Sequence, residues 1–98
     1  MSLPAYYIAE FTLKDAEAFA PYAERVRATV ARYGGTYLAQ GGATTALEGT
    51  PPRRVVVIRF PSMDDARRWY DSPEYAAIRP HRQRAGETRN FVVEGLAP

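Results

Sequence analysis

The sequence contains no cysteine and a single histidine, His81. The absence of cysteine excludes disulfides, thiolate metal sites and a cysteine nucleophile, and we expect a cytoplasmic protein. The carboxylates show no metal-ligand spacing, and a haem would have only His81 as a conventional axial ligand. We therefore predict that the protein uses no metal and no cofactor.

Long hydrophobic runs and concentrated charge are also missing. No apolar run is long enough for a transmembrane helix, and the N-terminus has no signal-peptide pattern. Thirteen Lys and Arg residues are interleaved with eleven Asp and Glu residues, which leaves a net charge of +2. Nucleic-acid binding needs a concentrated basic face. We expect neither a membrane nor a nucleic acid as a partner.

Aromatic residues, in contrast, are abundant, because they make up 12% of the chain and include seven tyrosines. So many aromatic side chains in a short chain indicate aromatic surface in a core, an interface or a pocket. The 98 residues fit a single domain, residues 1–98. A domain of this size buries only roughly 60–65% of its unfolded surface, so a partner subunit would stabilise it.

Residue patterns predict four strands, at residues 5–13, 36–40, 53–60 and 88–96. Gly41 and Gly42 indicate a bulge or bend after the second strand, and "TTALEG" (44–49) is a possible continuation of that strand.

Two helical segments alternate with these strands. The first follows a cap at Asp15 and ends at Gly34 and Gly35, and Pro21 predicts either a kink or a restart of the helix there. The second begins after Ser62, restarts after the "DSP" interruption (71–73), and is broken or bent again at Pro80 on the way to the last strand.

The predicted order is strand, helix, strand, strand, helix, strand, which is typical of the ferredoxin-like α+β fold, with an antiparallel sheet and both helices on one face. The run "VVVI" (55–58) in the clearest strand has no polar alternation. Such a run indicates that both faces of the strand are covered. A second copy of the sheet would cover the face that lacks helices, so we predict a homodimer through this open face.

Several segments together carry a resemblance to a known family: "YGGTYLAQGG", "LEG", "VVVIRFPSMDDARRWYDSPEYAAIRPHR" and "FVVEG". From about Tyr6 to Gly95, the chain resembles the bacterial family of domain of unknown function 1330 (DUF1330). The resemblance implies a ferredoxin-like fold in the dimeric α/β-barrel superfamily, and implies no settled activity. It also implies that Arg82 matches a common basic position, whereas the position of His81 is usually apolar.

The candidate ligand-binding residues are polar groups on strands and large aromatic groups. Glu10 and Arg59 lie on otherwise apolar strands. A buried ion pair between them at the dimer interface is one interpretation, and the lining of a small-molecule pocket is the other. Four aromatic residues could form the walls of such a pocket, with core packing as the alternative: Tyr7, Tyr37, Trp69 and Tyr75. The last two candidates are the basic residues His81 and Arg82.

Two functional hypotheses follow. The first is a homodimeric module that binds a small apolar or aromatic molecule. The second is a cofactor-independent enzyme, similar to a monooxygenase or an isomerase, that acts on a small aromatic or polyketide-like substrate. The sequence leaves open whether the protein is an enzyme, because no acid, base or nucleophile constellation is present. The first hypothesis is therefore preferred.

Overall fold

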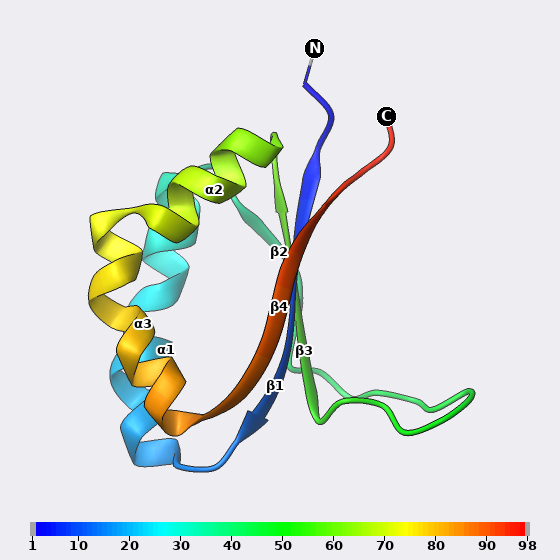
Figure 1. Ribbon diagram of the computed structural model, residues 1–98, viewed down its shortest axis with the longest axis vertical. Coiled ribbons are helices and arrows are strands. Elements are labelled where there is room, and N and C mark those ends of the chain that lie inside the picture. The colour runs from blue at the N-terminus through cyan, green and yellow to red at the C-terminus, as the bar shows by residue number, and fades with distance from the viewer. Residues whose placement is uncertain (1, 98) are drawn as a thin grey trace.

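The strands of the protein form one antiparallel sheet, in a computed structural model that describes residues 2–97. The four strands lie in the order β2-β3-β1-β4. Their bounds are β1 (Ala5–Leu13), β2 (Thr36–Gln40), β3 (Arg54–Phe60) and β4 (Gly86–Glu94). Figure 1 shows the sheet edge-on with the helices on one side only. This arrangement confirms the predicted ferredoxin-like α+β fold.

The helices are α1 (Ala16–Arg32), α2 (Met63–Asp71) and α3 (Pro73–Ala85). Each begins after a polar side chain, Asp15, Ser62 or Ser72, that accepts a hydrogen bond from a backbone N–H of the first turn. These bonds satisfy donors that have no partner within the helix, as the sequence predicted. Gly34, with φ of 82°, supplies the left-handed residue that follows α1.

Two prolines lie inside helices without ending them. α1 continues through Pro21 and α3 continues through Pro80. The sequence left a kink or a restart open at Pro21 and a break or a bend at Pro80; the restart and the break are wrong, because both helices continue. Each proline removes one backbone hydrogen bond. Beyond Pro21, Val26 and Val30 are buried, and beyond Pro80, Ala85 is buried, so packing offsets the missing bond.

The core lies between the sheet and the helices, with Trp69 of α2 fully buried at its centre. The Trp69 ring lies 4.3 Å from the ring of Tyr75, 4.9 Å from Tyr7 and 5.3 Å from Phe60, measured between centroids. Its indole N–H donates a 3.0 Å hydrogen bond to the hydroxyl of Thr29. Aromatic contacts of this kind stabilise packing beyond their burial alone, and here they hold α2 and α3 against the sheet, while the bond to Thr29 joins α2 to α1.

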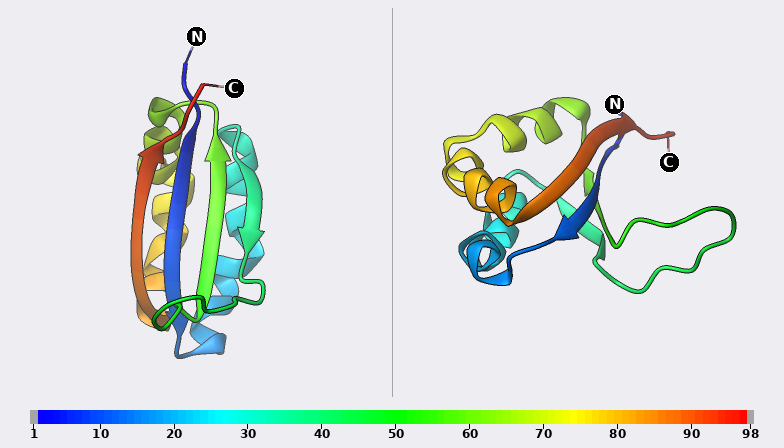
Figure 2. Two further views of the ribbon diagram at one scale, coloured as in Figure 1. Left: turned by 90° about the vertical axis from the view of Figure 1, so that its right-hand side faces the viewer. Right: turned by 60° about the horizontal axis from the view of Figure 1, so that its bottom comes forward.

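The other face of the sheet, here called the open face, carries alternate residues of all four strands and no helix (Figure 2). Its apolar side chains are half-buried or exposed: Tyr6, Ile8, Leu38, Val55, Val57, Phe91 and Val93. Both faces of β3 are thus apolar, as the sequence indicated. Within residues 2–97, no helix is long and apolar enough to cross a bilayer.

Residues 41–53 connect β2 to β3 and form an arm that extends away from the body on the side of the open face (Figures 1 and 2). The suggested continuation of the strand over residues 44–49 is wrong, because this segment has no strand structure. Gly41, with φ of 69°, turns the chain out of the sheet while its N–H still donates to the carbonyl of Val55. At the end of the arm, Leu47 is 92% exposed.

Candidate functional site: a cavity between the sheet and the helices

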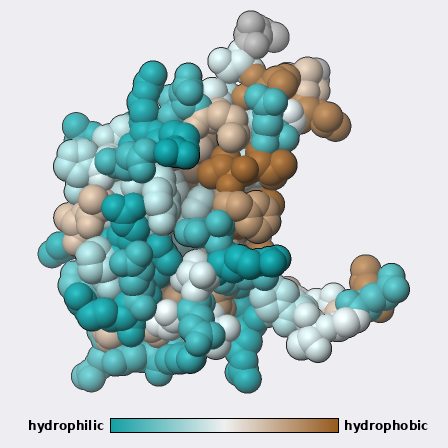
Figure 3. Space-filling view, in the orientation of Figure 1, coloured by the Kyte–Doolittle hydropathy of each residue, from teal (hydrophilic) through white to brown (hydrophobic). Residues whose placement is uncertain are grey.

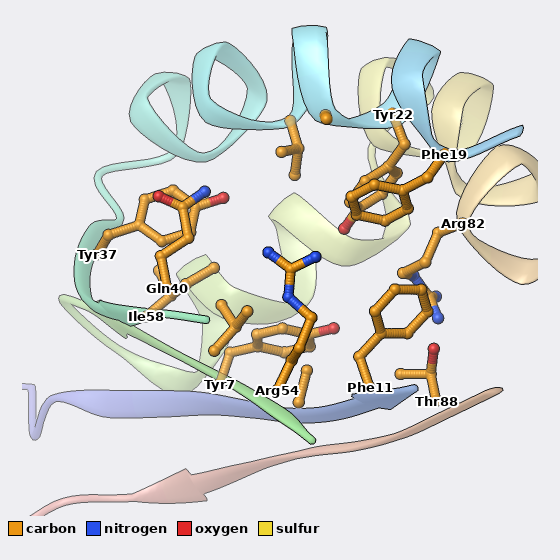
Figure 4. A pocket seen from close by; sticks show the side chains of 14 residues that line it. Tyr7, Phe11, Phe19, Tyr22, Tyr37, Gln40, Arg54, Ile58, Arg82 and Thr88 are labelled. Atoms are coloured by element: carbon orange, nitrogen blue, oxygen red, sulfur yellow. The ribbon is translucent and has the colours of Figure 1, made fainter. Parts of the chain in front are cut away.

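A cavity of about 200 Å³ lies between the inner face of the sheet and helices α1 and α3. Figure 4 shows side chains from strands and helices pointing into it. An engineered apolar cavity of about 150 Å³ in another protein binds benzene, so this space is large enough for a one-ring molecule.

Apolar and aromatic side chains form most of the lining. Phe19, Tyr22 and Val26 follow each other on α1 at spacings of three and four residues, which places them on one face of the helix. Phe11 of β1 stacks on Phe19, with ring centroids 5.2 Å apart. Ala9 of β1 has a small side chain and leaves room between these rings and the strands.

Polar groups lie where β2 and β3 meet the cavity. The Nε of Arg27 donates a 3.1 Å hydrogen bond to the Oε1 of Gln40, and its guanidinium lies 5.4 Å from the centre of the Tyr37 ring. Arg54 of β3 points into the cavity (Figure 4). Gly41 makes room for it, because a Cβ at Gly41 would lie 2.8 Å from the Nη2 of Arg54.

Arg82 of α3 is the buried charge of the cavity, since only 6% of the residue is exposed. Its guanidinium points from α3 towards Thr88 and the sheet (Figure 4). Within residues 2–97, the Nε of Arg82 and the Oγ1 of Thr88 are buried and have no hydrogen-bond partner. Burial acts to lower the pKa of Arg82, but the neighbouring Tyr75, Tyr7 and Tyr22 and a side-chain hydrogen bond to Tyr75 together raise the pKa, so the side chain stays charged.

The tyrosines around the cavity are neutral at ordinary pH. Burial raises the pKa of Tyr7 and of Tyr22 well above the usual value, and it raises the pKa of Tyr37 to about 12. The hydroxyl of Tyr7 accepts a 2.9 Å hydrogen bond from the Nδ2 of Asn90, and the hydroxyls of Tyr22 and Tyr75 lie 2.8 Å apart. These phenols can offer hydrogen bonds to a ligand, but they bring no negative charge.

Three of the predicted ligand-binding residues, Tyr7, Tyr37 and Arg82, line this cavity together. Trp69 and Tyr75 do not line it, because both are fully buried in the aromatic core behind it. Core packing, the alternative weighed for the aromatic candidates, describes these two residues.

The other three predicted residues lie elsewhere. Glu10 pairs with Arg89 on the neighbouring strand at 3.0 Å, whereas Arg59 is exposed and stands opposite Tyr6. Within one chain Glu10 and Arg59 do not pair, because the strand register places them four residues apart along β1; a pair between two subunits at the dimer interface stays a prediction. His81 is partly exposed, outside the cavity, with its Nδ1 3.0 Å from the Nη2 of Arg84.

Sequence reasoning missed several lining residues, namely Phe11, Phe19, Tyr22, Arg54 and Thr88. The strand members lie at alternate positions on the side that faces the helices, and Phe19 and Tyr22 lie on the apolar side of α1. These patterns identify an inner face, but they do not distinguish a packed position from one that borders a void.

The charge of the site is one-sided. No Asp or Glu side chain lines the cavity in the described part of the chain, whereas Arg54 and Arg82 both do. The local field therefore favours a negatively charged group. In residues 2–97, no three His, Asp or Glu side chains gather in a way that could hold a metal ion.

Comparisons with known proteins place the chain among proteins of this fold. Two crystal structures are of RPA0582 from Rhodopseudomonas palustris. The methylated form is 24% identical, with a TM-score of 0.80, and the match covers 100% of this chain and 84% of that one. SnoaB, a cofactor-independent oxygenase from Streptomyces nogalater, is 13% identical, with a TM-score of 0.69 and coverage of 99% and 97%.

A dimeric ferredoxin-like protein of unknown function from Thermobifida fusca is 15% identical, with a TM-score of 0.57 and coverage of 96% and 92%. At these identities, the likeness shows the fold alone. A comparison with curated proteins found no significant match. The model of one family, described as domain of unknown function (DUF1330), matches residues 4–96. The chain therefore belongs to the DUF1330 family.

Proposed function

We propose that the protein is a homodimeric module that binds a small aromatic or apolar molecule in the cavity between the sheet and the helices. The observation that carries this proposal is the partly open cavity of about 200 Å³ between the sheet and helices α1 and α3. A mostly apolar lining with a few converging polar groups is typical of small-molecule sites.

The open face supports the dimer. Phe91 and Val93 remain 44% and 46% exposed there, and Leu38 is 56% exposed. Figure 3 shows hydrophobic side chains gathered on the upper part of this side of the molecule. A second copy of the same face would bury these groups in a symmetric contact. A related solved structure is described as dimeric, which agrees with this proposal.

The arm, residues 41–53, fits the same arrangement. It extends beyond the open face, and a Cβ added at Gly42 or Gly49 would meet no atom within 4 Å. A partner subunit packed on the open face would provide a surface for Leu47, which contacts little within its own chain. We therefore expect the arm to lie against the partner.

A substitution that fills the cavity tests whether ligands bind there. The Ala9→Leu substitution places a larger side chain in the cavity lining, and Ala28→Leu, on the exposed side of α1, is the matched control. A panel of one-ring and two-ring aromatic compounds is screened by thermal shift and confirmed by calorimetry. A compound at about 100 times its Kd adds about 2.7 kcal/mol of stability, which is readily measured.

We expect at least one compound to stabilise the protein and the Ala28→Leu variant, and not the Ala9→Leu variant. If no compound raises the melting temperature, or if the Ala9→Leu variant responds as the unmodified chain does, the cavity is not a binding site.

The alternative function, a cofactor-independent oxygenase or isomerase, has weaker support. SnoaB is described as an oxygenase, but at 13% identity it shares only the fold. Within the described residues, neither a carboxylate nor an imidazole lines the cavity to accept a proton from a substrate. We therefore propose binding rather than catalysis.

A further inference from the structure

We infer that the ligand of the cavity carries an anionic oxygen group, such as a carboxylate, which the guanidinium of Arg82 binds. This inference rests on the proposed binding function and adds the chemical class of the ligand. An aromatic carboxylate fits both parts of the lining, because its ring would contact Phe11, Phe19 and Val26 while its charge meets Arg82.

A buried guanidinium is costly unless an opposite charge or a full set of hydrogen bonds accompanies it. Arg82 is 6% exposed, and none of the ion pairs among residues 2–97 includes it. Its Nε has no hydrogen-bond partner in the same part of the chain. Arg82 is one of the residues that line the cavity, so the protein holds a positive charge at the cavity wall with no carboxylate beside it in residues 2–97.

The side chain of Tyr75 hydrogen-bonds Arg82, but no surrounding group in residues 2–97 supplies an opposite charge. The guanidinium carbon of Arg82 lies 6.0 Å from the centre of the Tyr22 ring, a contact with the ring that leaves the Nε donor unused. The phenols of Tyr7 and Tyr22 stay protonated, as described above, so they supply no negative charge.

Other groups beside Arg82 suit the same ligand. Thr88, like Arg82, is one of the lining residues, and its hydroxyl is buried and unpartnered within residues 2–97. Arg54 adds a second positive charge to the lining. A carboxylate has two acceptor oxygens and can bind a guanidinium through two parallel hydrogen bonds. This geometry explains why an arginine, rather than a lysine, suits this position.

The test compares benzoate with benzamide, two one-ring probes of nearly the same shape that differ in charge. Calorimetry on the unmodified full chain measures both affinities. Because hydrogen bonds to charged groups are worth about 1.5–3 kcal/mol, we expect benzoate to bind at least about tenfold more tightly than benzamide. This comparison needs no variant and therefore does not depend on how a substitution affects folding.

Two variants then assign the preference to one residue. In Arg82→Gln, benzoate should bind at least about tenfold more weakly, while benzamide should change less than about twofold. Arg79→Gln is the matched control on the same helix. Arg79 contacts the ring of Tyr70 at 4.8 Å and lies outside the cavity, so both affinities should stay unchanged.

Each outcome decides the question. Equal binding of benzoate and benzamide to the unmodified chain overturns the anion inference and leaves the binding function standing. A benzoate preference that persists in a folded Arg82→Gln variant also overturns it. If Arg82→Gln does not fold, Arg82→Lys takes its place, because lysine keeps the charge but lacks the forked donors of the guanidinium. Unchanged benzoate affinity in Arg82→Lys overturns the role of Arg82. If neither probe nor any compound of the aromatic panel binds, both proposals fail.

Discussion

On the helix-covered face of the sheet Trp69 and Phe60 are fully buried, whereas on the open face Phe91 and Val93 are 44% and 46% exposed. Both faces are apolar, but one chain supplies cover for only one of them. A domain of about 100 residues has little surplus stability, so an uncovered apolar face favours a second subunit. The covered face therefore packs against the helices of the same chain, and we propose that the open face packs against the sheet of a second chain.

The two faces also differ in whether their arginine side chains are paired with a carboxylate. On the open face, the guanidinium of Arg89 meets the carboxylate of Glu10 at 3.0 Å. On the covered face, Arg82 is more deeply buried, yet no carboxylate accompanies it within residues 2–97. A structural arginine in the core would be expected to have a partner. Arg82 has Tyr75 as a hydrogen-bond partner but no opposite charge, and this is the basis of our proposal that a ligand supplies one.

The largest expected effect is on the covered face. Trp69→Ala should lower the free energy of unfolding by about 3–5 kcal/mol, because it removes the central ring of the core and leaves a void. Urea denaturation followed by circular dichroism measures this loss, with Phe91→Ala on the open face as the comparison. A loss of similar size at Phe91 in dilute protein would show that the two faces do not differ within one subunit.

The next effect concerns the open face and the dimer. Phe91→Lys should weaken the dimer at least about tenfold, because it would place an unpaired charge in the contact. Analytical ultracentrifugation over a range of concentrations measures this change. Ala28→Lys, on the exposed side of α1, should leave the dimer unchanged. Sedimentation as a monomer in the unmodified chain at micromolar concentration would contradict the dimer itself.

The smallest expected effect is the pH dependence of the free energy of unfolding that the buried phenol of Tyr7, on the covered face, causes. The folded pKa of Tyr7 lies above its usual value of 10.0, so its contribution to stability is complete below that pH and is lost as the pH rises towards the folded pKa. Above about pH 10, one such phenol lowers the free energy of unfolding by at most about 1.4 kcal/mol per pH unit. Tyr7→Phe should make the alkaline loss shallower by this amount in urea titrations, and an unchanged slope would contradict the burial of this phenol.

Much of the fold follows from local patterns that a single sequence contains. The caps at Ser62 and Ser72 are local, because each side chain bonds a backbone N–H three residues ahead. The unbroken apolar run of β3 predicted apolar side chains on both faces of the sheet, and the structure places them there. Pro80 was misjudged because the packing of α3 outweighs the hydrogen bond that the proline removes.

The site depends instead on contacts between residues that are distant in the chain. Tyr7, Tyr37 and Arg82 were chosen from residue type and resemblance, but nothing local could show that they share a cavity. Register excludes a pair between Glu10 and Arg59 within one chain, because Arg59 stands opposite Tyr6 and Glu10 opposite Val55. A hydrophobic pattern states which face of an element is buried. Only the packing of α1 and α3 on the sheet decides where that burial leaves a space, and that Arg82 borders it.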